Sequence, residues 1–273
     1  MKLKKALSIF TIVLFAVACS TNPFTGKKTL ALVPNSQILP MAFQQYDQFL
    51  SEHKVIKNTA DARMITNIGQ KISIAAERYL TANGYAGYLK DYAWDYNLVE
   101  DPAVNAWCMP GGKIVFYTGI LPITQGEAGI AAVMGHEVAH ALANHGQQRM
   151  SAGQLQALGA VAGNVAFSKD PKNQQIFNDA YGIGSTVGVM LPFSRGHESE
   201  ADRIGLTLMA IAGYEPLEAA DLWVRMKENA GGNAPAEILS THPSSDTRIN
   251  NIKSWAADAK AEARKFGVTS FKR

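Results

Sequence analysis

His136-Glu137-Val138-Ala139-His140 stands in the middle of an apolar stretch that the sequence predicts to be helical from Thr124 to Gly146. Two histidines four residues apart project from one face of a helix, so both imidazoles can bind one metal ion. The Glu137 carboxylate lies beside that face, where it can accept a proton from a metal-bound water. Zinc suits this set because it binds imidazole nitrogen and, in catalytic sites, takes three protein ligands and leaves one position open. We therefore predict one zinc ion per chain.

The residues around this motif favour a metal site over a helix that merely carries two core or surface histidines. Apolar residues at 131–133 and 141–142 flank the motif, which is typical of a buried helix. Buried imidazoles and carboxylates need polar partners or a cation. Thr124 and Glu127 have the spacing of a capping box, which predicts the start of the helix.

The third zinc ligand is expected from a later segment of the chain. The extension that places a third histidine just after the motif needs glycine at 143 and histidine at 146, where Ala143 and Gly146 stand. His145 lies well round the helix from the two ligands. We predict that it is a structural, hydrogen-bonding histidine.

The segment Glu198-Ser199-Glu200-Ala201-Asp202 fits the third ligand. Glu198 and Asp202 share a helix face, so Glu198 can bind zinc while Asp202 accepts the other N–H of a ligating histidine. Glu200 and His197 are rival ligands. However, Glu200 lacks an acidic partner four residues later, and His197 should point away from the Glu198 face. The remaining alternative is an exposed acidic helix start, which the helix dipole favours.

The N-terminus resembles an export signal. Lysines at 2, 4 and 5 precede an apolar run over 6–18, which ends in small residues before Cys19. The run is short for a transmembrane helix. We predict a lipoprotein signal peptide over 1–18 and a lipid anchor on Cys19, against the alternative of an ordinary signal peptide with an incidental cysteine. Several acyl chains would hold the protein stably on a membrane.

Composition then excludes several classes of protein. The 273 residues are 47% hydrophobic with a formal net charge of +3, which excludes a disordered chain. Without the three signal lysines, 23 basic and 23 acidic residues remain, so we expect no nucleic acid partner. Cys108 is then the lone cysteine, and we predict a small buried residue rather than a nucleophile.

The sequence predicts one α+β domain, mostly helical, over 36–273, preceded by the lipidated cysteine and a tether over 19–35. Strands are expected over Tyr92–Val99 and Lys113–Tyr117, the second after a Pro110-Gly111-Gly112 turn. Two apolar stretches rich in glycine and alanine, Gln154–Phe167 and Asn178–Leu191, are too short to span a bilayer. We interpret them as close-packed helices or a mobile lid rather than membrane-inserted segments.

Four stretches carry a resemblance to the zinc metallopeptidase family that includes HtpX, the CAAX prenyl protease and the mitochondrial Oma protease. The chain is most similar to its bacterial periplasmic lipoproteins, of the LoiP and BepA type. The stretches are Asn22–Lys27, the region from Asn105-Ala106 to Thr118-Gly119, the two metal-site segments above with Ser194-Arg195, and Ser240-Thr241-His242-Pro243 with Arg248-Ile249.

This resemblance implies a gluzincin-type site with His136, His140 and Glu198 on zinc and Glu137 as general base. It also implies a small β-sheet whose edge strand, in the region of Asn105 and Ala106, borders the cleft and pairs with an extended substrate.

His242 is the candidate that stabilises the oxyanion or caps zinc in a resting state. Arg248 either shares the first role or anchors the segment. Without the resemblance, His242 would be interpreted as a surface histidine in a loop.

The predicted function is a zinc-dependent endopeptidase on the periplasmic side of the bacterial envelope, anchored to the outer membrane. Its substrates, on the resemblance alone, are unfolded or misassembled envelope proteins. The alternative is a zinc-capped, chaperone-like or binding lipoprotein with little proteolytic activity.

Overall fold

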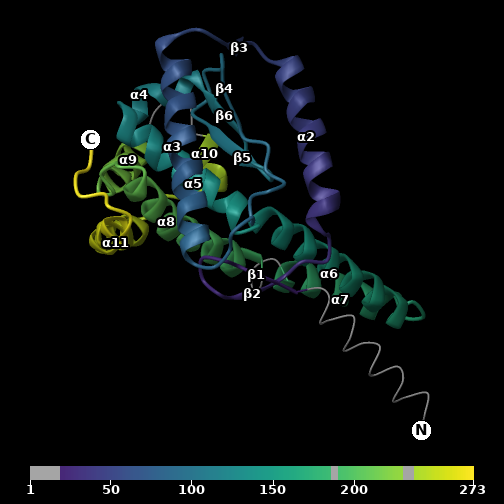
Figure 1. The fold of residues 1–273 in the computed structure, drawn as a ribbon. Coiled ribbons are helices and arrows are strands. Elements are labelled where there is room, and N and C mark those ends of the chain that lie inside the picture. The colour runs from purple at the N-terminus through teal and green to yellow at the C-terminus, as the bar shows by residue number, and fades with distance from the viewer. Residues whose placement is uncertain (1–18, 186–189, 230–236) are drawn as a thin grey trace. The chain divides into compact units, whose positions relative to one another are not determined.

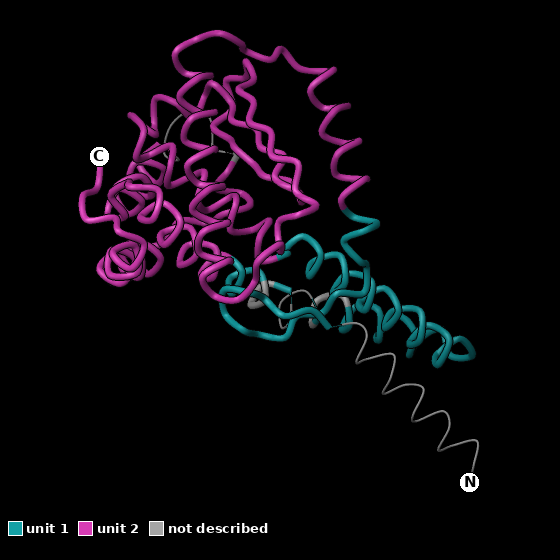
Figure 2. Tube along the Cα trace, in the orientation of Figure 1, with its two compact units in different colours: residues 1–38, 144–197 teal, residues 39–143, 198–273 magenta. Residues whose placement is uncertain are grey.

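The computed structural model describes residues 19–185, 190–229 and 237–273. It is α+β and mostly helical with small sheets, which confirms the predicted fold class. The chain forms two compact units (Figure 2). Unit 1 holds the described residues up to Ile38 together with Asn144–His197, and unit 2 holds Leu39–Ala143 and Glu198–Arg273.

Unit 2 is built on a sheet with the strand order β3-β4-β6-β5. Its strands are β3 (Val55–Ile56), β4 (Asp95–Val99), β5 (Ala106–Met109) and β6 (Lys113–Tyr117). β4 and β6 are parallel, with Asn97 opposite Val115, whereas β5 is antiparallel to β6, with Cys108 opposite Ile114. β4 begins later than predicted because Tyr92 is held in a turn by its N–H, which donates to the Leu89 carbonyl at 3.0 Å.

The predicted strand over Lys113–Tyr117 is confirmed without change as β6. Ile114, Val115 and Phe116 are all fully buried, because β6 lies between two strands and both of its faces are covered. Gly111 and Gly112, in the turn before it, have φ angles of 84° and 83°, a backbone conformation that favours glycine.

Helices cover both faces of the sheet (Figure 1). α2 (Asn35–Glu52) places Tyr46 against Val99, Val115 and Tyr117 on one face. α3 (Ala60–Ala82) packs against β4 and α5, and α5 (Glu127–Leu142) also contacts β5. The other helical segments of unit 2 are η1 (Thr118–Ile120), α4 (Leu121–Thr124), α9 (Glu218–Asn229), α10 (Glu237–Thr241) and α11 (Asp246–Lys265). Unit 2 also holds α8 (Leu191–Ile211) from Glu198 onward.

The predicted boundaries of the motif helix are wrong at both ends. Gln125 has a φ of 58° and Gly126 a φ of 151°, so the backbone breaks between Thr124 and Glu127 and no capping box forms. The Thr124 hydroxyl instead donates to the Leu121 carbonyl at 3.0 Å. At the other end α5 stops at Leu142, and Asn144 in the left-handed conformation separates it from the next helix.

Unit 1 combines a two-stranded ladder with two helices. β1 (Cys19–Thr21) pairs antiparallel with β2 (Lys28–Leu30), and α6 (His145–Ala166) packs against α7 (Pro171–Ser185) and β2. α6 begins at His145 rather than at the predicted Gln154, and α7 begins at Pro171 rather than at the predicted Asn178. In the first turn of α7, Asp170 accepts a hydrogen bond from the Asn173 N–H. Residues 186–189 of the second predicted stretch lie outside the described residues.

No helix within the described ranges has the length and hydropathy needed to cross a membrane. The predicted signal peptide, 1–18, lies outside the described residues, whereas Cys19 is exposed at the start of β1. The boundaries expected at residues 18 and 35 stay predictions.

Candidate metal and peptidase site

α5 is a buried helix, which explains why its polar residues gather partners. All residues from Ala128 to Leu142 are buried, and His136, Glu137 and His140 lie within that run. A buried imidazole or carboxylate is stable only when it is hydrogen-bonded, paired or bound to a cation. The partners come from α8 and from the segment after α10.

Four buried side chains converge on one point: His136, His140, Glu198 and His242. One donor atom from each lies within 4.8 Å of the others. His136 Nε2 is 3.1 Å from His140 Nε2 and 3.2 Å from His242 Nδ1. Glu198 contributes Oε2 at 2.8 Å from His242 Nδ1 and Oε1 at 3.3 Å from His140 Nε2.

This donor set fits a zinc ion. Tetrahedral ligands about 2.0–2.2 Å from zinc lie roughly 3.3–3.5 Å from one another, close to the distances found here. Three imidazoles and one carboxylate are also ligands that zinc prefers. The cluster leaves out the rival ligands Glu200 and His197.

His145 and His197 form a separate pair. Both are buried, and their rings stack with centroids 4.1 Å apart. His197 Nε2 lies 3.1 Å from the Gln148 side-chain oxygen. The structure therefore confirms the expected structural position of His145.

Asp202 lies one helical turn after Glu198 and contacts both a cluster histidine and an arginine. Its Oδ1 is 2.9 Å from His136 Nδ1. The Arg248 guanidinium donates to both carboxylate oxygens, from Nη2 at 2.6 Å and from Nε at 2.7 Å. This bidentate pair fixes the Asp202 carboxylate, which in turn orients the His136 ring.

Charge in the cluster is strongly coupled. Burial alone would lower the pKa of His136, but hydrogen bonds to Asp202 and Glu198 outweigh it and raise that pKa to about 9. Burial would raise the pKa of Glu198, yet hydrogen bonds with the three histidines hold it far below its usual range. Without a metal, the cluster therefore favours a protonated His136 beside an ionised Glu198. A metal cation can supply the same positive charge in place of that proton.

Trp223 is a site residue that the sequence does not predict. Its ring lies under the Arg248 guanidinium, with Cζ 3.6 Å from the ring centroid, and meets the His136 ring edge to face at 5.9 Å. α9 presents Trp223 on the same buried face as Ala219 and Met226. That spacing indicates only a core helix, so nothing in the sequence marks the tryptophan as part of the site.

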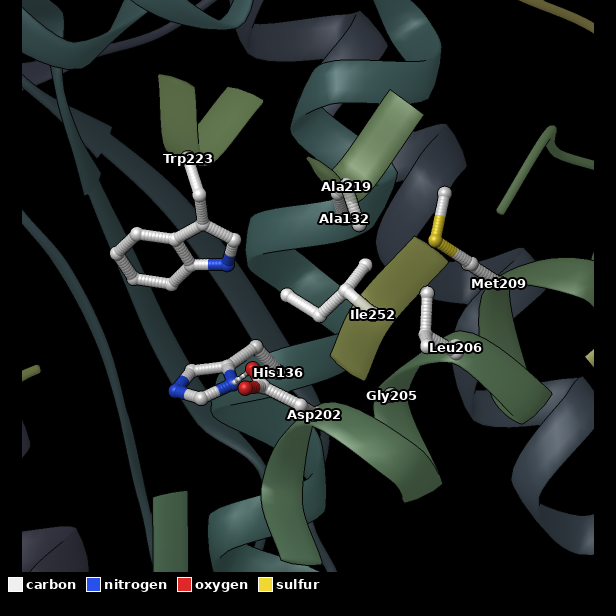
Figure 3. Close-up of a pocket in the computed structure, with 9 residues that line it drawn as sticks. All are labelled: Ala132, His136, Asp202, Gly205, Leu206, Met209, Ala219, Trp223 and Ile252. Carbon is white, nitrogen blue, oxygen red and sulfur yellow. Dashed lines mark ion pairs between the residues drawn. The ribbon is translucent and has the colours of Figure 1, made fainter. Parts of the chain in front are cut away.

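A small cavity of about 10 Å³ lies behind His136 (Figure 3). The figure shows the Trp223 ring on one side of the cavity and the His136–Asp202 pair on another, with Ile252 between the helices. The volume is close to that of a single water. This side of His136 has no room for a substrate side chain.

Glu137 differs from its neighbours because one of its oxygens has no partner. Its Oε1 is buried and accepts no hydrogen bond in the described part of the chain. His242 Nε2 lies 3.6 Å from this oxygen. A buried carboxylate oxygen held without a partner is available for proton transfer.

His242 is buried in the cluster, which excludes the alternative of a surface histidine. Its backbone N–H donates to the Ile238 carbonyl at 2.8 Å, and the Ile238 N–H donates to the Val104 carbonyl at 3.2 Å. Contacts with residues distant in sequence therefore position His242, and its own loop does not reveal them.

Asn105 and Ala106 lie at the start of β5, which is an edge strand as expected. Within the described sheet β5 pairs with β6 alone. The Asn105 side-chain oxygen accepts from the Ala106 N–H at 2.9 Å. Cys108 on the same strand is half-buried, and burial holds the pKa of its thiol well above the usual value, which disfavours a nucleophilic role.

α5 and α8 approach closely at two glycines. A Cβ on Gly135 would lie 2.8 Å from the Gly205 carbonyl oxygen, and one on Gly205 would lie 2.9 Å from the Gly135 carbonyl carbon. The absence of side chains lets the two backbones meet. The crossing brings the two motif histidines of α5 close to Glu198 and Asp202 of α8.

Comparison with known proteins gives a match to Peptidase family M48 over residues 71–256. Mitochondrial metalloendopeptidase OMA1 of Schizosaccharomyces pombe is 37% identical over 193 residues, which cover 70% of this chain and 54% of the yeast protein. The beta-barrel assembly-enhancing protease of Escherichia coli is 23% identical over 247 residues, 89% of this chain and 48% of that protein. The chain spans about half the length of these relatives.

Proposed function

The chain belongs to peptidase family M48, and from that premise we propose that it is a zinc-dependent endopeptidase of the bacterial cell envelope. The observation that carries the proposal is the convergence of His136, His140, Glu198 and His242 beside Glu137. All of these residues fall within the stretch that matches the family. The alternative of a helix with two unrelated histidines does not account for this cluster.

His136, His140 and Glu198 would hold the zinc ion. Zinc bound there supplies a Lewis acid that polarises a peptide carbonyl and lowers the pKa of water. Asp202 keeps the His136 ring in place through Nδ1, leaving Nε2 for the ion. Arg248, stacked on Trp223, holds Asp202.

Glu137 acts as the general base in this proposal. Its unpartnered Oε1 accepts a proton from the attacking water and returns it to the leaving amine. His242 Nε2, 3.6 Å from that oxygen, is placed to stabilise negative charge on the reacting carbonyl.

We propose that substrates are extended segments of unfolded or misassembled envelope proteins. β5 is an edge strand, and a substrate backbone that pairs with its free side would be bound without regard to most side chains. The start of that strand, at Asn105 and Ala106, is the proposed contact. Folded proteins would be poor substrates because their backbone groups are already paired.

The proposed location is the periplasmic side of the outer membrane. The apolar run over 6–18 and the exposed Cys19 support export followed by lipid attachment. Mass spectrometry of the protein from a bacterial envelope tests this. A lipid adduct on Cys19 and the absence of 1–18 are expected, and an unmodified Cys19 would contradict the lipid anchor.

The activity is tested with Glu137→Gln in the full chain. The variant should bind zinc as the wild-type protein does, because Glu137 is outside the ligand set, but cleave casein at least about a hundredfold more slowly. Zinc content is measured by elemental analysis of the same samples. Unchanged cleavage in the zinc-loaded variant would refute the mechanism.

A second function, a zinc-capped binding or chaperone-like lipoprotein, is favoured by one observation. His242 Nδ1 lies 2.8 Å from Glu198 Oε2 and 3.2 Å from His136 Nε2, so it occupies the position of a fourth ligand. His242→Ala distinguishes the two functions. Increased casein cleavage would indicate that His242 caps the ion, whereas decreased cleavage would indicate that it takes part in catalysis.

A further inference from the structure

The α6–α7 hairpin of unit 1 is held together along one face of each helix. A Cβ on Gly159 would lie 2.1 Å from the Tyr181 hydroxyl, and one on Gly163 would lie 2.0 Å from the Phe177 ring. These contacts place residues 159 and 163 against α7, which lies alongside α6 (Figure 1). The face of α6 that carries them is therefore fully used by the hairpin.

A different face of α6 is apolar and exposed. Leu158, Val161 and Val165 recur at helical spacing on the side away from Gly159 and Gly163, and their exposed fractions are 63%, 61% and 69%. Three large apolar side chains exposed to this degree on one helix face indicate an interaction surface. We call Leu158, Val161 and Val165 the outer α6 face.

The sequence around this face has the composition of a membrane-surface helix. No charged residue occurs from Met150 to Phe167, and exposed Arg149 and Lys169 stand just outside the two ends. Long cationic side chains at such positions reach headgroups while the apolar face enters the acyl boundary. The helix lies along the surface in this arrangement.

The apolar surface continues toward the predicted lipid attachment site within the same unit. Cys19 is the register partner of Leu30 in the β1–β2 ladder. Leu30 and Leu155 line the same pocket of about 630 Å³, together with side chains of α7. Leu155, one helical turn before Leu158, therefore shares a pocket with Leu30, the register partner of Cys19.

We propose that the outer α6 face docks on the surface of a lipid bilayer. The bilayer is favoured over a second copy of the chain because exposed Arg149 and Lys169 flank the uncharged stretch, as expected for a helix that meets headgroups. The acyl chains proposed on Cys19 would also enter a bilayer close to Leu30, the register partner of Cys19. The proposal is independent of the peptidase activity.

The test uses the full chain with Cys19→Ala and Cys108→Ala, so that one introduced cysteine carries a fluorescent dye. Val161→Cys reports on the outer α6 face. Gln175→Cys is the matched control, because Gln175 is exposed on the other helix of the hairpin and its side chain donates to Asp179 of α7 at 3.0 Å. Vesicles of phosphatidylcholine and phosphatidylglycerol are the membrane, and iodide quenching measures how accessible each dye is.

Vesicles should lower iodide quenching at position 161 severalfold, with a blue-shifted emission, and leave position 175 unchanged. No change at 161, or an equal change at both positions, would overturn the proposal. Protection at 161 that needs no vesicles and grows with protein concentration would also overturn it, in favour of a second copy. Circular dichroism checks the fold, and Val165→Cys replaces Val161→Cys if that variant does not fold.

Discussion

Gly135 of α5 and Gly205 of α8 meet backbone to backbone, and a Cβ on Gly205 would lie 2.9 Å from the Gly135 carbonyl carbon. Because the obstacle is main chain, no side-chain rotation can relieve the contact. The two helices would have to separate. The same two helices carry three of the four cluster residues, so the distance between them sets the geometry of the metal site.

Gly205→Ala should therefore weaken zinc binding and lower the free energy of unfolding by about 1–3 kcal/mol, the usual cost of overpacking. Zinc titration and urea unfolding measure the two effects. Gly196→Ala on the same helix is the control, because a Cβ there meets nothing within 4 Å. A Gly205→Ala protein with wild-type stability and zinc affinity would show that the helices adjust freely.

Asp202→Asn should reduce zinc affinity by about 10–100-fold, as is usual when the partner of a ligating histidine is lost. The amide keeps the size of the side chain but cannot pair with both the Arg248 guanidinium and the His136 ring. Competition with a chromogenic chelator measures the affinity. Asp221→Asn, at a more exposed carboxylate, should leave it unchanged, and equal effects of the two substitutions would argue against an orienting role.

Trp223→Leu should lower peptidase activity by disordering Arg248. The leucine retains an apolar side chain but loses the ring surface that the guanidinium covers at 3.6 Å, an interaction of about 2 kcal/mol when desolvated. Trp223→Phe should restore part of the activity because it restores a ring. If Phe and Leu behave alike in zinc affinity and in the proposed casein cleavage, Trp223 contributes packing alone.

The C-terminal segment should stabilise the start of α5 in a pH-dependent way. The hydrogen bond from Lys272 to Glu127, 2.6 Å long, is the main cause that lowers the pKa of Glu127. A carboxyl whose pKa is lower in the folded state stabilises the fold above its unfolded pKa of about 4.5, and this contribution is lost as the pH falls through the folded pKa.

Glu127→Gln should accordingly lower the free energy of unfolding by less than about 1 kcal/mol at pH 7, the range for exposed ion pairs, and by less at pH 3 than at pH 7. Urea unfolding at the two pH values gives the difference from wild type. Glu228→Gln, at an exposed position of α9, serves as the control. A larger cost at pH 3 than at pH 7 would reverse the assigned sign.

The sequence predicts those parts of the site that depend on local spacing. Two histidines four residues apart, and Glu198 four residues before Asp202, share helix faces by geometry alone, and the structure brings them together. Their catalytic roles stay predictions. The strand over Lys113–Tyr117 is also predictable from the sequence, because a short continuous apolar run after a glycine turn is typical of a buried strand.

The parts that could not be predicted depend on contacts between distant segments. His242 is positioned through Ile238 and Val104, and without a family resemblance it reads as a loop histidine. Trp223 has the spacing of any core residue, and its partner Arg248 belongs to another helix. The predicted capping box is wrong for a different reason. Gln125 and Gly126 adopt positive φ angles, which the spacing of Thr124 and Glu127 does not reveal.

The cluster residues are far apart along the chain, with 106 positions between His136 and His242 and 44 between Glu198 and His242. An ion held by all of them closes two long loops at once, as a pair of disulfides would, and so reduces the entropy of the unfolded chain only while it stays bound. Folding and zinc binding would then be coupled, so that the ion stabilises the folded chain. Free zinc in the surrounding compartment would consequently prolong the lifetime of the polypeptide, quite apart from whether it cleaves anything.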